Sequence, residues 1–216
     1  GRLFRLVTGF VGKFINEASK IENLTTQFNI LTGSVENSKV LLREIRDFAA
    51  TTPFQLEGIA AAGRTLLAFN FEQEKVVPLL RQIGDISAIT GKSLQELSLV
   101  YSQVSAAGKL TGERWIQLAE SGVVLDDIIA DKLGVSVKNV RDEISKGNVT
   151  FEIFRDSFAE LTKEGGRFFQ GTTKLAKTFT GRLSTFQDII KEVRAEIGER
   201  LLPTIKQGLT TFTNLI

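Results

Sequence analysis

The chain has no cysteine, no histidine and no methionine, and only 3 prolines interrupt its 216 residues. Without cysteine there is no disulfide, no thiolate nucleophile and no cysteine-bound zinc. Without histidine there is no imidazole to act as a general base or to ligate a metal. These absences exclude Ser-His-Asp hydrolases, Cys-His proteases, most zinc enzymes and haem proteins. Carboxylate, lysine or Mg²⁺ chemistry would remain, but the densest acidic group, Asp126, Asp127 and Asp131, does not converge on one point of a helix, so we expect no enzyme, no metal site and no cofactor.

Long apolar runs are also missing. No stretch of about 18 apolar residues is present, so the sequence predicts no membrane span. The first residues mix Arg2 and Arg5 with apolar residues that continue as a helical pattern, and no small-residue cleavage site follows, so we expect no signal peptide. Because the chain starts at Gly1 and stops at Ile216 inside apolar repeats, we expect a piece of a longer protein.

Charge is distributed unevenly along the chain, although the net charge is only +2 and the composition, 42% hydrophobic and 24% charged, is typical of a globular protein. Residues 51–162 carry 11 basic and 15 acidic residues, whereas residues 163–216 carry 9 basic and 5 acidic ones. An acidic surface does not attract phosphates, so the middle is a poor candidate for nucleic-acid binding. The basic C-terminal part could meet an acidic partner or simply present solvated helix faces.

Apolar residues recur every three or four positions almost everywhere, which predicts an all-α protein. Near the N-terminus the spacing alternates between four and three over more than four heptads, typical of a long amphipathic or coiled-coil helix. Glu17 is the one polar residue at nine seam positions. The seam residues expected to pack or self-associate here are Val7, Phe10, Phe14, Ile21, Leu24 and Phe28.

The C-terminal segment carries a second long apolar stripe. Several of its steps are four residues, so a straight helix fits as well as a supercoil. Pro203 lies inside the stripe and should kink or break the helix. The stripe residues expected to pack or self-associate are Leu183, Phe186, Ile190, Val193 and Ile197.

Shorter helices are predicted between these two segments. Ser34 can cap the first of them, and Ser93-Leu-Gln-Glu96 is a capping box that opens another. Gly165-Gly166 reads as a flexible joint. The predicted helices after the one ending near Ala50 cover 55–68, 72–90, 93–107, 113–121, 125–133, 136–146 and 151–163. We therefore expect a multi-helix domain of short helices, residues 34–164, flanked by a long amphipathic helix at 1–33 and a basic one at 165–216.

One stretch has the spacing of a helix-turn-helix. Ala130 would let two helices cross closely, Gly134 would permit the turn, and Val140 would pack the second helix back. Lys138, Asn139 and Arg141 would then face a DNA groove. Residues 113–147 carry 7 acidic and 5 basic residues, so phosphate affinity is poorly supported. A DNA-binding regulator built on residues 113–147 is the alternative function, and salt-dependent binding to a duplex would distinguish it.

Residues 30–190 resemble the tape measure domain in the N-terminal part of tail tape measure proteins of long-tailed bacteriophages and prophages. Single stretches are weak signals, but their order and spacing together are specific. The stretches are Thr51-Thr-Pro-Phe54, Leu66-Leu-Ala68, Pro78-Leu-Leu80, Gly84-Asp85, Tyr101-Ser-Gln103, Ala107-Gly-Lys-Leu-Thr-Gly-Glu113, Gln117-Leu-Ala-Glu-Ser-Gly122, Leu133-Gly-Val-Ser136, Lys146-Gly147, Phe151, Gly165-Gly-Arg-Phe168 and Thr178-Phe-Thr-Gly-Arg-Leu-Ser184. The family often has glycine where Phe69-Asn70 stands, and proline at the position of Val124.

The resemblance implies a structural protein that lies in the growing tail tube, sets the tail length and leaves before DNA passes. It implies contacts with the tail tube protein, tail assembly chaperones and tail tip or baseplate proteins. The expected location is the virion tail, in the tube or at its end, and the host bacterial cytoplasm during assembly. The apolar end helices add possible self-association, and no sequence-specific binding of nucleic acid is expected.

Overall fold

The computed structural model describes the backbone of residues 2–213 and the side chains of residues 15–178, 182–203 and 207. The described backbone consists of helices joined by turns and loops and contains no β-strand, which confirms the predicted all-α class. The helices are α1 (Arg2–Thr32), α2 (Val35–Ala50), α3 (Leu56–Ala68), α4 (Gln73–Thr90), α5 (Leu94–Ala107), α6 (Gly112–Glu120), α7 (Asp126–Leu133), the short 3₁₀ helix η1 (Val137–Asn139), α8 (Val140–Lys146), α9 (Phe151–Glu160), α10 (Gly171–Ala176) and α11 (Phe179–Thr213).

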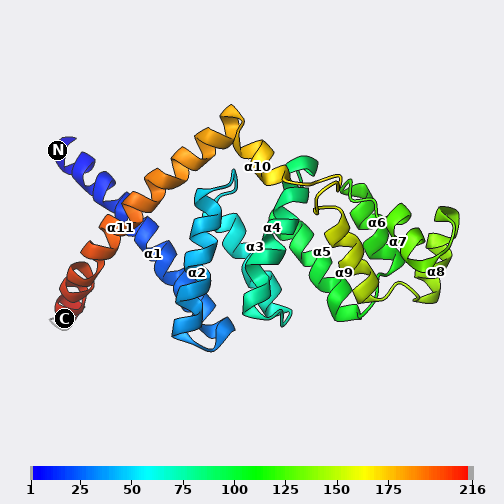
Figure 1. Ribbon diagram of the computed structural model, residues 1–216. Helices are drawn as coiled ribbons and strands as arrows, with labels where there is room; N and C mark the ends of the chain where they lie inside the picture. Colours follow the sequence, from blue (N-terminus) through cyan, green and yellow to red (C-terminus); the bar gives the residue numbers. More distant parts are fainter. Residues whose placement is uncertain (1, 214–216) are drawn as a thin grey trace.

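The helices form an elongated array (Figure 1). The long helices α1 and α11 cross and contact each other at one end. Helices α2, α3, α4, α5 and α9 follow side by side, and α6, α7 and α8 form the opposite end. Helix α10 contacts α4, and a sharp corner then turns the chain into α11, which runs back to α1.

Local sequence signals explain where these helices begin. The hydroxyl of Ser34 accepts a hydrogen bond from the backbone N–H of Asn37, and the hydroxyl of Ser93 accepts one from the N–H of Glu96. Each satisfies a donor that the first turn of a helix leaves free. Both caps confirm the sequence prediction.

A single apolar core runs through the array from Phe28 of α1 to Phe168, which follows α9 in the chain. Its widest part is an aromatic cluster around Tyr101 of α5. The ring of Tyr101 lies 5.0 Å from that of Phe158 and 5.2 Å from that of Phe154, centroid to centroid. Phe71 and Phe151 complete the cluster. It joins α5 to α9, so residues on both sides of the α6–α8 segment share one core.

The α6–α8 segment leaves the array and returns to it at adjacent points, while α6 packs on α5 and α7 packs on α9. The backbone N–H of Leu110 donates to the carbonyl of Val149 over 2.9 Å, and the N–H of Phe151 donates to the carbonyl of Gly108 over 2.9 Å. These two bonds hold the entry and the exit of the segment next to each other. Residues 111–148 therefore form a lobe at the end of the array that shares its apolar core.

Several sequence predictions need correction. The helix expected at 136–146 is divided into η1 and α8, and the helix expected at 151–163 ends at Glu160. Gly166 is not part of a flexible joint, because a Cβ there would lie 2.4 Å from the carbonyl oxygen of Glu160. Pro203 does not break α11, which continues to Thr213.

The C-terminal segment also differs from the long helix expected over residues 165–216. A turn and α10 occupy its first part, and the long helix α11 begins only at Phe179. Helix α10 contacts α4, and α11 contacts α2, so this segment packs on the middle of the chain. The division into three domains at residues 33 and 164 stays a prediction.

Candidate interaction site at the junction of the end helices

A cleft of about 260 Å³ lies where α1, α2, the start of α3 and α11 meet. Its floor is apolar and is formed by Ile21, Leu24, Ala49, Leu56 and Ala195. Its rim is charged and more acidic than basic. The charged residues of the rim are Glu17, Lys20, Arg46, Glu57, Asp188, Lys191, Glu192, Glu196 and Glu199.

Polar contacts across this cleft hold α11 against the array. The ammonium group of Lys191 donates to the side-chain carbonyl of Gln55 and, over 3.2 Å, to Asp188 on its own helix. It also lies 4.0 Å from a carboxylate oxygen of Glu57. Arg46 of α2 approaches Glu199 of α11 to 3.9 Å. Because these groups are partly exposed, each ion pair contributes about 0–1 kcal/mol, so the junction is held by many weak contacts.

Asp188 is the buried member of this network, with a relative exposure of 9%. Its Oδ1 accepts the bond from Lys191, while its Oδ2 is buried without a hydrogen-bond partner. Burial raises the pKa of Asp188 because it disfavours the charged form, and the nearby Lys191 opposes that effect only in part. The inner face of α11 thus places a carboxylate against the array.

The outer face of α11 is apolar and exposed to solvent. Phe186 is 60% exposed and Val193 is 49% exposed. A contiguous apolar patch of this kind on a monomer marks an interaction surface. The exposed apolar side chains of the helix are Leu183, Phe186, Ile189, Ile190, Val193, Ile197 and Leu201.

The two predicted seams are placed differently by the structure. On α1, Phe28 is fully buried, Leu24 packs against the core and Ile21 lines the cleft. Val7, Phe10 and Phe14 lie outside the residues whose side chains are described. On α11, the five seam residues are all exposed, and Ile189, which the sequence prediction omitted, is exposed between this face and the cleft that it also lines. The sequence signal for Ile189 is its apolar side chain directly before the seam residue Ile190.

The motif with helix-turn-helix spacing has the predicted local geometry. Ala130 and Val140 are buried, and Gly134 adopts a left-handed conformation with φ of +67°. Lys138, Asn139 and Arg141 are exposed. The helix that would read DNA, α8, has only 7 residues and follows a 3₁₀ turn.

The large aromatic side chains away from the junction belong mainly to the interior. Tyr101 and Phe168 are buried, and burial raises the pKa of Tyr101 to about 12. Trp115 is half-buried and donates from Nε1 to Asp126 over 3.2 Å. Within the described residues, no three acidic side chains converge in a geometry that could hold a metal ion. Among the described helices, none is long and apolar enough to cross a membrane.

The described residues thus define an all-helical protein whose prominent feature is an apolar interaction surface. A comparison with protein-family models matches residues 12–199 to the tape measure protein family. The chain belongs to this family, since the match covers most of its length and includes the junction of α1 and α11. It is accordingly a structural protein of the bacteriophage tail. Searches of curated proteins and of solved structures give no match.

Proposed function

We propose that this chain acts in the assembly of the tail tube and in setting its length, with residues 34–164 serving as a docking module near one end of the tail. The observation that carries the proposal is the side-by-side packing of α2 to α9 in a member of the tape measure protein family. A ruler gains length most effectively as one extended helix, at about 1.5 Å per residue. Side-by-side helices add width instead.

The partners we propose are the tail tube protein, the tail assembly chaperones and proteins of the tail tip or baseplate. The folded array offers faces for them along its length, and the lobe at 111–148 projects from the end opposite α1 and α11 (Figure 1). The length scale would then lie in helical segments to which α1 and α11 connect. Assembly in the host cytoplasm, and location in the tube or at its end, follow from this role.

A deletion in the phage or prophage tests the proposal. Drawn out as one helix, residues 34–164 would span about 200 Å. If the segment is a docking module, its deletion abolishes or disorganises tail assembly, which electron microscopy of lysates detects. Intact, infectious tails shortened by about 200 Å would show that the segment is part of the ruler.

A smaller deletion serves as the matched control. The entry and exit of the segment at Leu110 and Val149 are adjacent, so a short turn can replace residues 111–148. A ruler would lose about 57 Å of tail with these residues. We expect either tails of normal length or a loss of assembly, and no uniform shortening.

A further inference from the structure

The cleft at the junction of the end helices carries more negative than positive charge. Six carboxylates line it, together with the cationic side chains of Lys20, Arg46 and Lys191. Each of these cations already lies within 4.0 Å of a carboxylate that lines the cleft. Arg200, which lies outside the cleft, pairs with one further carboxylate, that of Glu196. With Arg200 included, six negative groups face four positive ones, so the cleft keeps a formal charge of −2.

The excess negative charge lies on one face of α11. Glu192 is exposed at the cleft and forms no ion pair within the part of the chain that the structure describes. Asp188, four residues earlier, is 9% exposed, and among the described residues its Oδ2 has no hydrogen-bond partner. The ammonium group of Lys191 beside it is shared with Gln55 and Glu57. Carboxylates four residues apart on a helix repel each other, so a cation in the cleft would relieve both.

The floor of the cleft selects an apolar side chain. It is formed by Ile21 and Leu24 of α1, Ala49 of α2, Leu56 of α3 and Ala195 of α11. Its volume of about 260 Å³ is small beside the roughly 300–1,000 Å³ of sites for drug-sized molecules. Side chains of four helices thus surround a space that suits one large apolar side chain, with carboxylates around its mouth.

The length of the cleft matches a short helix. Its lining residues on α11 run from Asp188 to Glu199, a distance of about 16 Å at the rise of a helix. A helix docks into such a groove through an apolar residue, while side chains one turn away reach the rim. Lysine or arginine one turn on either side of an apolar residue is therefore the pattern that floor and rim together favour.

We propose that the cleft binds a short basic helix of another protein, with one large apolar side chain on the floor and lysine or arginine side chains at Glu192 and Asp188. The proposal goes beyond the role in tail assembly, because it concerns the chemistry of one cleft and does not depend on which tail protein supplies the helix. The bound helix contacts α1, α2, α3 and α11 together, so it also stabilises their junction.

A lysine-rich model peptide tests the proposal on the full chain. About 12 residues of alanine and lysine around one central phenylalanine span about 18 Å as a helix, with lysines about three and four positions from the phenylalanine. Fluorescence anisotropy of the labelled peptide measures binding. We expect a dissociation constant on the order of 10–100 μM at low salt, and affinity at least about fivefold weaker at about 0.5 M salt.

Two altered peptides separate the contributions of anchor and charge. Replacing the phenylalanine by alanine should weaken binding at least about tenfold, because the floor is left unfilled. Replacing the lysines by glutamates should abolish binding. Equal binding of the alanine peptide would indicate mere attraction to a charged surface, and equal binding of the glutamate peptide mere attraction to an apolar one. Spermidine that bound as tightly as the original peptide would indicate a polyamine site. Each of these three results would overturn the proposal.

Variants of the chain test where the peptide binds. Ala50 is exposed and lines the cleft, so Ala50→Phe should block the floor and weaken binding at least about tenfold. Glu192→Gln should weaken binding about two- to fivefold. Glu120→Gln, which changes an exposed glutamate of α6, is the matched control and should bind as the unmodified chain does. Asp188→Asn should weaken binding although it stabilises the chain, a combination that unfolding does not produce.

The melting temperature gives a second measurement. Saturating peptide should raise it by about 2–5 °C for the unmodified chain and leave it unchanged for Ala50→Phe. Binding that Ala50→Phe does not alter, or that Glu120→Gln and Glu192→Gln weaken equally, would place the peptide elsewhere on the chain and overturn the proposal. A lack of binding by the unmodified chain would overturn it as well, whatever the chain does in tail assembly.

Discussion

Gly171 allows α10 to pack directly on α4, and its replacement by alanine should destabilise the protein. A Cβ at Gly171 would lie 2.2 Å from the carbonyl oxygen of Asp85 and 2.9 Å from a side-chain carbon of Ile89. The backbone N–H of Thr172 also donates to the carboxylate of Asp85 over 2.9 Å, so α10 is bonded to α4 at the residue that follows Gly171. Removing the clash between the new Cβ and the carbonyl oxygen of Asp85 requires α10 to shift by about 1 Å, and this shift also breaks the hydrogen bond from Thr172.

The size of the effect follows from these contacts. Overpacking of a tight contact costs about 1–3 kcal/mol, and the disturbed hydrogen bond adds about 1 kcal/mol. We expect about 3 kcal/mol in total. For a chain of this length, about 1 kcal/mol corresponds to roughly 2–4 °C, so Gly171→Ala should lower the melting temperature by about 6–12 °C.

Circular dichroism during heating measures this change, and Gly58→Ala is the matched control. Gly58 lies in α3, and a Cβ there would meet nothing within 4 Å. The same substitution should therefore stabilise the protein slightly, by about 0.4–1 kcal/mol, because it restricts the unfolded chain. If Gly171→Ala melted as high as Gly58→Ala, the close approach of α10 to α4 would be refuted.

Two further predictions concern the junction of the end helices. Asp188→Asn should raise the melting temperature near pH 7, because burial raises the pKa of Asp188 in the folded state and so penalises its charged form. The gain in melting temperature over the unmodified chain should shrink as the pH falls through that raised pKa, and it should vanish below about 3.9, the pKa of an unfolded aspartate. A gain that stays constant over pH would contradict this prediction. Ile21→Asp should lower stability by about 2 kcal/mol, because it places a carboxylate on the apolar floor beside Glu17 and Glu57. The same change at exposed Ile30 is the control, and equal melting temperatures for the two variants would show that Ile21 does not face the cleft.

The sequence was sufficient to predict the helices, because their signals are local. Three- and four-residue spacing identifies helical segments, and Ser34 and Ser93 identify where two of them begin. The predicted helix boundaries are wrong where tertiary contacts, rather than the local sequence, determine where a helix or turn lies. Gly165-Gly166 reads as a joint, yet the close approach of Gly166 to Glu160 makes a tight turn that only the packing of α9 and Phe168 requires.

The candidate site could be predicted only in part, since an apolar stripe does not reveal what covers it. The stripes of α1 and α11 look alike in sequence, but Phe28 is buried whereas Phe186 is exposed. The difference arises because α11 packs through Asp188, Lys191 and Ala195, a combination that no periodicity rule assigns to an interior. The charged contacts between Lys191, Gln55 and Glu57 join residues more than 130 positions apart, so they have no local signal.

The crossing of α1 and α11 has a mechanical consequence. Helix α1 begins and α11 ends at the same end of the molecule, and the crossing lies between these ends and the rest of the array (Figure 1). Tension applied through the two end helices therefore loads the crossing first. The nearby ion pairs that join α11 to α2 and α3, Arg46–Glu199 and Lys191–Glu57, are weak and partly solvated, so they separate before the apolar core around Tyr101 is strained.

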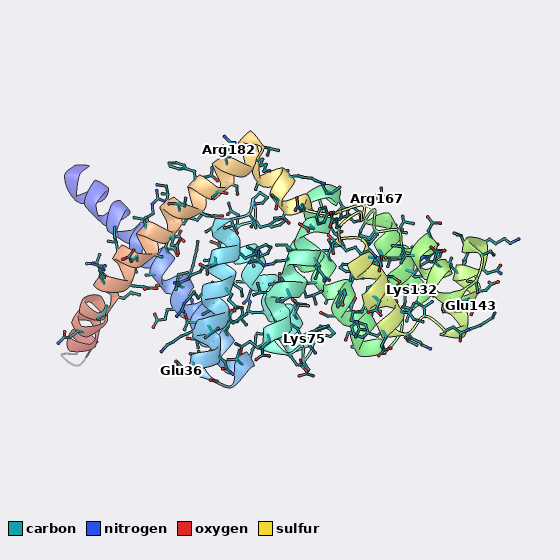
Figure 2. All side chains as sticks on the ribbon, in the orientation of Figure 1. Glu36, Lys75, Lys132, Glu143, Arg167 and Arg182 are labelled. Atoms are coloured by element: carbon teal, nitrogen blue, oxygen red, sulfur yellow. The ribbon has the colours of Figure 1, made fainter. Side chains whose placement is uncertain are left out.

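The charged side chains of Glu36, Lys75 and Lys132 are exposed on α2, α4 and α7, helices that such a pull does not load at first (Figure 2). Under such a pull the chain would extend by opening at the crossing of α1 and α11, while α2 to α9 and the end of α1 that carries Phe28 stay folded. It would behave as an extensible link with a rigid body attached to one side.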